Sequence, residues 1–110
     1  MPASFTNYGS LNGTTPVLLQ APPDQGSLLV RELYIRNIDT FPIGLHVYAS
    51  DGIKDVEVFA GIVRVGYTLQ MSHHDVIVLN TSTGLYAVLD APVVANQPTY
   101  KIGFAFENQI

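Results

Sequence analysis

The alternation of apolar and polar residues is clearest over residues 43–60, which read IGLHVYAS-DG-IKDVEVFA. An Asp-Gly pair between two alternating runs is typical of a β-hairpin closed by a two-residue type I′ turn. With Asp51 and Gly52 in the turn, the aliphatic face pairs Val47 with Val56. The opposite face carries three further pairs: Tyr48 with Asp55, His46 with Glu57, and Gly44 with Phe59.

Short apolar runs recur about every ten residues, separated by residues that form turns. We expect further strands over residues 15–21, 28–38, 61–71, 75–79, 85–90 and 100–107, with the 61–71 strand bent at Gly61 or Gly66. In the 28–38 strand, Leu29, Leu33 and Ile35 share the expected buried face. About eight short strands and no amphipathic helical run predict an all-β, antiparallel β-sandwich or small barrel. A jelly-roll-like sandwich is favoured, with an immunoglobulin-like one as the alternative.

Residues 75–79 and 85–90 flank a polar loop, NTSTG, and are expected to form a second hairpin. This register pairs four sets of apolar residues: Leu79 with Leu85, Val78 with Tyr86, Ile77 with Ala87, and Val76 with Val88. Both faces of the pair are then apolar, whereas a sheet in a monomeric sandwich normally has one solvated face. We therefore expect a second cover: a neighbouring subunit, a target surface or the N-terminal segment.

Residues 1–14 are polar and contain three isolated apolar residues, Phe5, Tyr8 and Leu11. The segment is interpreted either as a frayed end or as a flexible arm that becomes ordered on a neighbouring subunit. Residues 15–110 are expected to form one domain. The N-terminus lacks the basic and apolar regions of a signal peptide.

Charged residues make up only 13% of the chain, against about 25% in an average protein. We therefore expect part of the surface to be apolar and covered by a partner. A net charge of −4 and five scattered basic residues argue against nucleic-acid binding. No apolar run approaches the ~20 residues of a membrane span, and the absence of cysteine excludes disulfides and thiolate ligands.

His73, His74 and Asp75 are the residues that most resemble metal ligands. Adjacent histidines rarely bind one ion together, so we interpret the segment as a polar turn. The alternative is that three copies of His73 or His74 share an ion on a symmetry axis. His46 and Glu57 suggest an ordinary cross-strand pair. Without a G-x-S-x-G elbow or a phosphate-binding loop, we expect no enzyme and no cofactor.

Aromatic residues on outward-facing strand positions indicate a binding surface better than these polar residues do, because aromatic residues suit protein interfaces and also stack on sugar rings. The interface candidates combine these aromatics, the residues of the N-terminal segment and the apolar residues of the second hairpin: Phe5, Tyr8, Leu11, Tyr34, Tyr48, Phe59, Val76, Val78, Tyr86 and Val88.

Four segments carry a family resemblance: GSLLVRELYIRNIDTFPIGLHVYASDG, YTLQMSHHDVIVLN, GLYAVLDAP and YKIGFAFE. Together they resemble small virion proteins of tailed phages, over about three-quarters of the chain. Such proteins are β-sandwich head decoration (cement) proteins or tail-associated modules. The His73-His74-Asp75 segment departs from the Pro/Gly-Asp turn more usual there.

The resemblance implies a structural protein without catalytic residues. We expect a decoration protein on the outer capsid surface of the virion, made in the host cytoplasm, that binds the major capsid protein as a homo-oligomer, with a trimer favoured. Two alternatives stay open: a tail or neck connector, and a carbohydrate- or receptor-binding module.

Overall fold

The computed structural model describes the backbone of residues 3–71 and 77–108, and the side chains of residues 7–71 and 77–102. The described chain consists of strands joined by loops, and it contains no helix long and apolar enough to cross a membrane. The strands are β1 (Ala3–Ser10), β2 (Val17–Gln20), β3 (Ser27–Arg36), β4 (Ile43–Ser50), β5 (Asp55–Val63), β6 (Thr68–Met71), β7 (Ile77–Asn80), β8 (Gly84–Leu89) and β9 (Thr99–Asn108).

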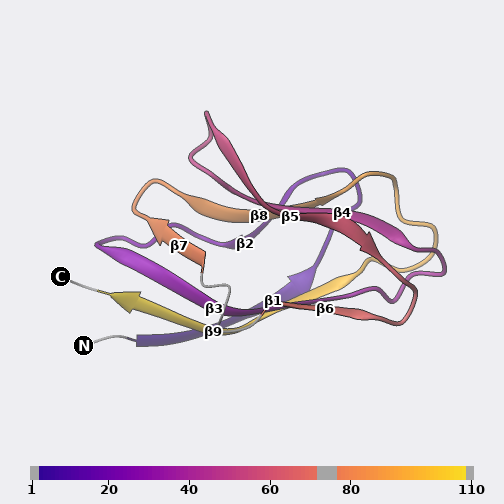
Figure 1. Ribbon diagram of the computed structural model, residues 1–110, viewed down its shortest axis with the longest axis horizontal. Coiled ribbons are helices and arrows are strands. Elements are labelled where there is room, and N and C mark those ends of the chain that lie inside the picture. The colour runs from indigo at the N-terminus through magenta and orange to yellow at the C-terminus, as the bar shows by residue number, and fades with distance from the viewer. Residues whose placement is uncertain (1–2, 72–76, 109–110) are drawn as a thin grey trace.

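The strands form two antiparallel sheets that lie one above the other (Figure 1). One sheet has the order β2-β8-β4-β5. The other has the order β1-β9-β3-β6, with β7 also paired to β3 beyond the end of β6. Together, β6 and β7 cover one edge of β3 as a single interrupted strand. The predicted antiparallel β-sandwich is confirmed.

The pairing is nested about the β4–β5 connection. Moving outward from this connection, β4 pairs β5, β3 pairs β6 and β7, β2 pairs β8, and β1 pairs β9. The chain is thus one long antiparallel ribbon folded over into two sheets, which is the jelly-roll arrangement of two Greek keys. The predicted hairpin of residues 43–60 is the tip of this ribbon.

The core is formed by the inner faces of both sheets. Its buried apolar residues are Leu11, Leu19, Leu28, Val30, Leu33, Ile35, Ile43, Leu45, Val47, Val63, Ile77, Leu79, Leu85, Ala87, Leu89 and Ile102. On β3 the buried set differs from the prediction, because Leu28 and Val30 face inward in place of Leu29. The register against β9 shifts on both sides of Glu32. This irregularity shifts the positions that face inward by one residue along β3.

The β4–β5 hairpin has a longer turn than predicted. Residues 51–54 form the connection, and Ser50 pairs with Asp55. The Asp51 carboxylate accepts the backbone N–H groups of Ile53 and Lys54, at 2.9 and 2.7 Å, and no described non-glycine residue has a positive φ. The side chain therefore stabilises a four-residue turn instead of a type I′ turn, which would need positive φ at Asp51.

The new register, with an irregularity between Val47 and Tyr48, changes which β5 residues face the core. Phe59 pairs with Val47 and packs against the core, so the prediction that it projects outward is wrong. Val56, predicted on the aliphatic face with Val47, is 58% exposed. A shift of an odd number of residues reverses the face of every residue beyond it.

The single strand predicted over residues 61–71 and the pairing predicted for the second hairpin are also wrong. Residues 61–71 do not form one strand, because a turn at 64–67, with Gly66 at a φ of +78°, takes the chain from β5 in one sheet to β6 in the other. The strands β7 and β8 exist as predicted, but β7 pairs with β3 and β8 pairs with β2 and β4. The apolar side chains of β7 and β8 are therefore divided between the two sheets, and the second hairpin does not form.

Most of the expected N-terminal arm is an edge strand, because β1 pairs along β9. Leu11 follows β1 and is 1% exposed within the core, so it cannot serve as an anchor on another subunit. Tyr8 is 80% exposed. The side chain of Phe5, like residues 72–76 with His73, His74 and Val76, lies outside the described residues.

The loops at the right-hand end of Figure 1 are joined through Asn37. Its side-chain amide donates to the carbonyl oxygens of Phe41 and Val63, at 2.9 and 3.0 Å. Its backbone N–H donates to the carbonyl of Tyr67, and its carbonyl accepts the N–H of Gly66. This buried residue therefore ties the β3–β4 connection to the β5–β6 turn.

Asp39 extends the same network to the β8–β9 loop. Its buried carboxylate accepts the backbone N–H groups of Val94, Ala95 and Asn96, at 3.0, 2.8 and 3.2 Å, and that of Thr40 at 2.8 Å. These hydrogen bonds, led by the one from Val94, lower the pKa of Asp39 from its ordinary 3.8 to about 2, against the opposing effect of burial.

We predict that Asp39 makes the protein acid-sensitive. A carboxyl whose pKa falls on folding stabilises the folded state above its unfolded pKa, and that contribution is lost as the pH falls from about 4 to about 2. Asp39→Asn should lower Tm at pH 7 by roughly 5 °C or more and flatten the dependence of Tm on pH over this range. Thermal unfolding followed by circular dichroism tests this, with Asp24→Asn in the exposed 21–26 loop as the matched control. Equal behaviour of the two variants would contradict the assignment.

Candidate functional site

The outer face of the four-stranded sheet carries three of the interface candidates, Tyr48, Tyr86 and Val88, and we call it the front face. Strand register arranges it in three rows. The rows run Leu18, Tyr86, Tyr48 and Glu57; then Val88, His46 and Ala60; then Asp90, Gly44 and Ile62. This face thus combines apolar and aromatic side chains with carboxylates.

Tyr48 and Tyr86 form an aromatic pair in the first of these rows. They are register partners on β4 and β8, and their rings stack with centroids 5.6 Å apart and planes inclined by 14°. Partial burial, with the nearby charge of Asp55, raises the pKa of the Tyr48 hydroxyl. The pair remains half-exposed, so its outer surface is open to a partner.

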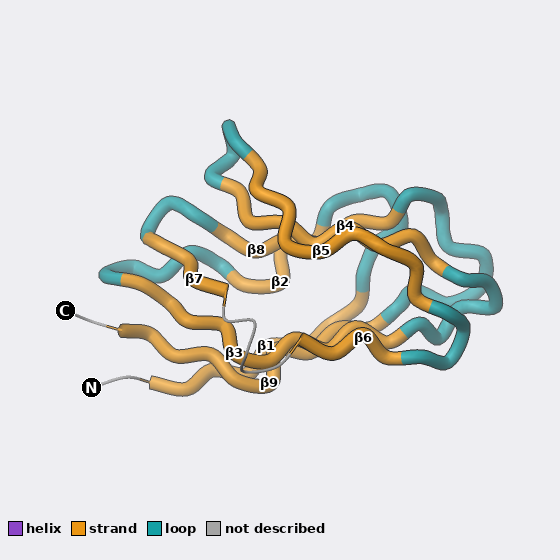
Figure 2. Tube along the Cα trace, in the orientation of Figure 1, coloured by secondary structure: helices purple, strands orange, loops and turns teal. Residues whose placement is uncertain are grey.

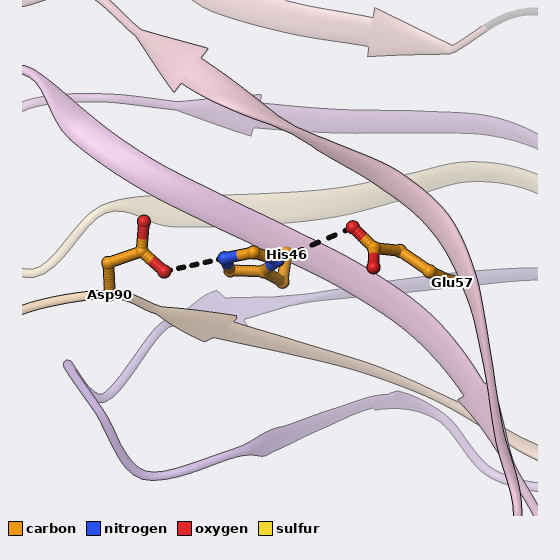
Figure 3. Close-up of polar contacts among 3 residues, drawn as sticks. All are labelled: His46, Glu57 and Asp90. Carbon is orange, nitrogen blue, oxygen red and sulfur yellow. Dashed lines mark hydrogen bonds and ion pairs between the residues drawn. The ribbon is translucent and has the colours of Figure 1, made fainter.

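His46 lies between two carboxylates on the same face (Figure 3). Its Nε2 is 2.5 Å from Oδ1 of Asp90, and its Nδ1 is 3.4 Å from Oε1 of Glu57. The three residues come from β4, β5 and the residue after β8, so the imidazole links three strands. A methyl group at Gly44 would clash with the Asp90 carboxylate, and only glycine there leaves room for this arrangement.

The hydrogen bond to Asp90, followed by the bond to Glu57, raises the pKa of His46 above its ordinary 6.5, while partial burial opposes the rise. The contribution of this cluster to stability is therefore present below pH 6.5 and is lost as the pH rises through the higher folded pKa. Both ring nitrogens are engaged by carboxylates, so the geometry suits a surface ion pair. No group of three or more metal-ligating side chains is arranged to hold an ion in residues 7–71 and 77–102.

The structure divides the predicted interface residues between two surfaces. Tyr48, Tyr86 and Val88 lie on the front face, whereas Tyr34 and Val78 lie on the outer side of the five-stranded sheet. Tyr8 is also on that second surface, opposite Lys101. The prediction therefore identified aromatic side chains on both outer faces without relating them to one another.

Two features of the molecular surface were not predicted from the sequence. Asp90 joins His46 only through the register of β4 against β8, which a local sequence pattern does not reveal. Ile53, placed in the predicted hairpin without a role, is 96% exposed, and Ile62 is 75% exposed. Their signal in the sequence was the excess of apolar over charged residues, which indicates exposed apolar surface without locating it.

No protein-family model matches the chain, and no curated protein is similar enough to it to count as a match. One similar solved structure comes from work described as "Bacillus endospore appendages form a novel family of disulfide-linked pili". The TM-score is 0.51 at 12% identity, over 96% of this chain and 82% of the other. This likeness supports the β-sandwich fold. The present chain contains no cysteine with which to form a disulfide.

We predict that Asp90 controls the protonation of His46 more strongly than Glu57 does. Asp90→Asn should lower the pKa of His46 by more than Glu57→Gln does, because the Asp90 contact is the shorter and the larger cause of the raised pKa. Gly44→Ala should act in the same direction as Asp90→Asn, since the added methyl displaces the carboxylate. Titration of the imidazole protons by NMR measures all three. A larger effect of Glu57→Gln would refute the geometry.

Proposed function

We propose that this protein is a non-enzymatic structural protein of a tailed-phage virion that decorates the outer capsid surface. It is made in the host cytoplasm, binds the major capsid protein and acts as a homo-oligomer. The resemblance over residues 26–107 motivates this proposal. The jelly-roll arrangement is compatible with it, because jelly rolls are common in viral shells and in lectins.

The observation that carries the proposal is the projecting tip of the β4–β5 hairpin. Figures 1 and 2 show this connection standing away from the rest of the four-stranded sheet. Ile53 at the tip is 96% exposed, and Val56 beside it is 58% exposed. An isolated apolar residue on a projection is suited to insertion into a pocket of a partner, where burial of an isoleucine side chain contributes about 1.5–3 kcal/mol.

Hydrogen bonds within the turn restrict the backbone of the tip. Besides the two bonds to Asp51, the hydroxyl of Ser50 accepts the N–H of Gly52 at 3.0 Å, and the φ of Gly52 is +91°. A preorganised loop loses less conformational entropy on binding. One anchor of this kind gives modest affinity, and an oligomer that carries several would bind the shell through all of them together. Bridging neighbouring capsid subunits in this way raises the barrier to shell rupture.

We predict that Ile53→Ser weakens capsid attachment by about 10-fold or more per anchor without lowering Tm, because the side chain is buried only in the bound state. Particles produced from a genome that lacks this gene would be incubated with purified protein, and bound protein would be measured after sedimentation. Val94→Ser is the matched control, since Val94 is a 63% exposed valine in the 90–98 loop at the other end of the sandwich. Wild-type binding by Ile53→Ser would contradict the anchor. Attachment to tails instead of heads would favour the connector alternative.

The Tyr48–Tyr86 pair favours carbohydrate binding as a second candidate function. Exposed aromatic rings on a sheet face can stack on sugar rings, and the neighbouring carboxylates Glu57 and Asp90 can accept hydrogen bonds from sugar hydroxyls.

This candidate predicts specific signals on a glycan array that are lost in both Tyr48→Ala and Tyr86→Ala. Phe59→Ala is unsuitable as a third test, because that side chain packs against the core. Tyr8→Ala, on the other sheet, is the control that should retain the signals. An array without signals for the folded wild-type protein would exclude the sugars tested.

A further inference from the structure

The outer side of the five-stranded sheet is a second surface, which we call the back face. Its best-described part consists of two rows across β1, β9, β3 and β6. The rows run Tyr8, Lys101, Tyr34 and Gln70; then Ser10, Thr99, Arg36 and Thr68. Tyr8, Lys101 and Arg36 are exposed, and Tyr34 is half-exposed. Like the front face, this surface therefore presents two tyrosines beside charged residues.

The two faces differ in the charges that they present. The strands β2, β4, β5 and β8 contain no lysine or arginine, and the front face presents the carboxylates of Glu57 and Asp90, which hold His46 between them. The back face presents Arg36 and Lys101, both of them exposed. The back face also holds Glu32, but the hydroxyl of Tyr34 donates to that carboxylate at 2.6 Å, within the face itself.

We propose that the front face of one copy packs against the back face of the next copy. In this contact Glu57 and Asp90 face Lys101 and Arg36, while the tyrosines of the two faces provide the apolar area. Aromatic anchors and complementary charges are the usual components of a specific interface. The inference rests on the proposed function only in treating the protein as an assembling subunit. The partner of each face is another copy of this chain.

The positions of the faces determine what such a contact builds. Figure 1 looks along the shortest molecular axis and shows the sheets one above the other, so the two faces point in opposite directions. A contact between different, opposite surfaces is repeated by each added copy and does not close into a small ring. The molecule extends 45 × 27 × 21 Å, so a face bounded by the longest and shortest extents covers at most roughly 900 Å², which leaves room for the ~800 Å² per partner of a standard interface. We therefore infer open-ended association instead of a closed trimer.

Charge reversal on each face tests the contact in the free protein by analytical ultracentrifugation. The wild-type protein should associate progressively with concentration at low salt, and less at about 1 M salt, where charges are screened beyond about 3 Å. Glu57→Lys and Lys101→Glu should each weaken self-association by about 10-fold or more. The double variant E57K/K101E should restore it, as should an equimolar mixture of the two single variants, because each mixture contact pairs opposite charges. Asp24→Lys, in the 21–26 loop, is the matched control and should associate like the wild type.

Three results would overturn the inference: a monomeric wild-type protein at every concentration, association that stops at a trimer, or single reversals that behave like the control in folded protein. None of these results concerns capsid attachment, which is measured separately with Ile53→Ser. Loss of the front-to-back contact with retained attachment would therefore leave the proposed function standing. Front-to-back association without attachment to particles would leave the present inference standing and remove the capsid role.

Discussion

The carboxylate of Asp39 holds together the end of the sandwich where the chain crosses repeatedly between the sheets. It accepts hydrogen bonds from backbone N–H groups of the β8–β9 loop, while Asn37, two residues earlier, binds the β5–β6 turn. The β1–β2 connection joins the same end, because the N–H of Leu11 donates to the carbonyl of Pro98. The jelly roll needs these loops side by side, and buried backbone groups in such loops need partners. A single Asn-Ile-Asp segment supplies many of them.

The nested ribbon explains which parts of the fold could be predicted. Strand positions follow from local alternation and turn residues, and most of them agree with the structure. Pairing does not follow, because β7 and β8 are adjacent in the chain but belong to different sheets. The Asn80–Gly84 segment looks like a hairpin loop, and nothing local distinguishes it from a connection between sheets. The β4–β5 turn was located correctly, yet its length depends on two hydrogen bonds of the Asp51 side chain, which residue type alone does not reveal.

The same limit applies to the candidate surface. Outward tyrosines could be identified by alternation, and Tyr48 is one of them. Phe59 could not be placed, because an irregularity in the β4–β5 register reverses the face of the residues beyond it. The partnership of Tyr48 with Tyr86, and of His46 with Asp90, depends on the pairing of β4 with β8 across 38 or more residues of sequence. Charge segregation between the two faces is likewise a property of the topology. Which of the few charged residues lie together on one face can be determined only once the strands are assigned to their sheets.

The central claim is that this sandwich assembles through its two outer faces. Because the chain has no cysteine, one cysteine can be placed on each face, with Ala60→Cys on the front and Ser10→Cys on the back. Treatment of this double variant with a short bismaleimide, followed by denaturing electrophoresis, measures the contact directly. The account predicts a ladder of covalent multimers from the double variant and monomers from each single variant. Monomers alone from the double variant, or dimers from Ala60→Cys by itself, would contradict it.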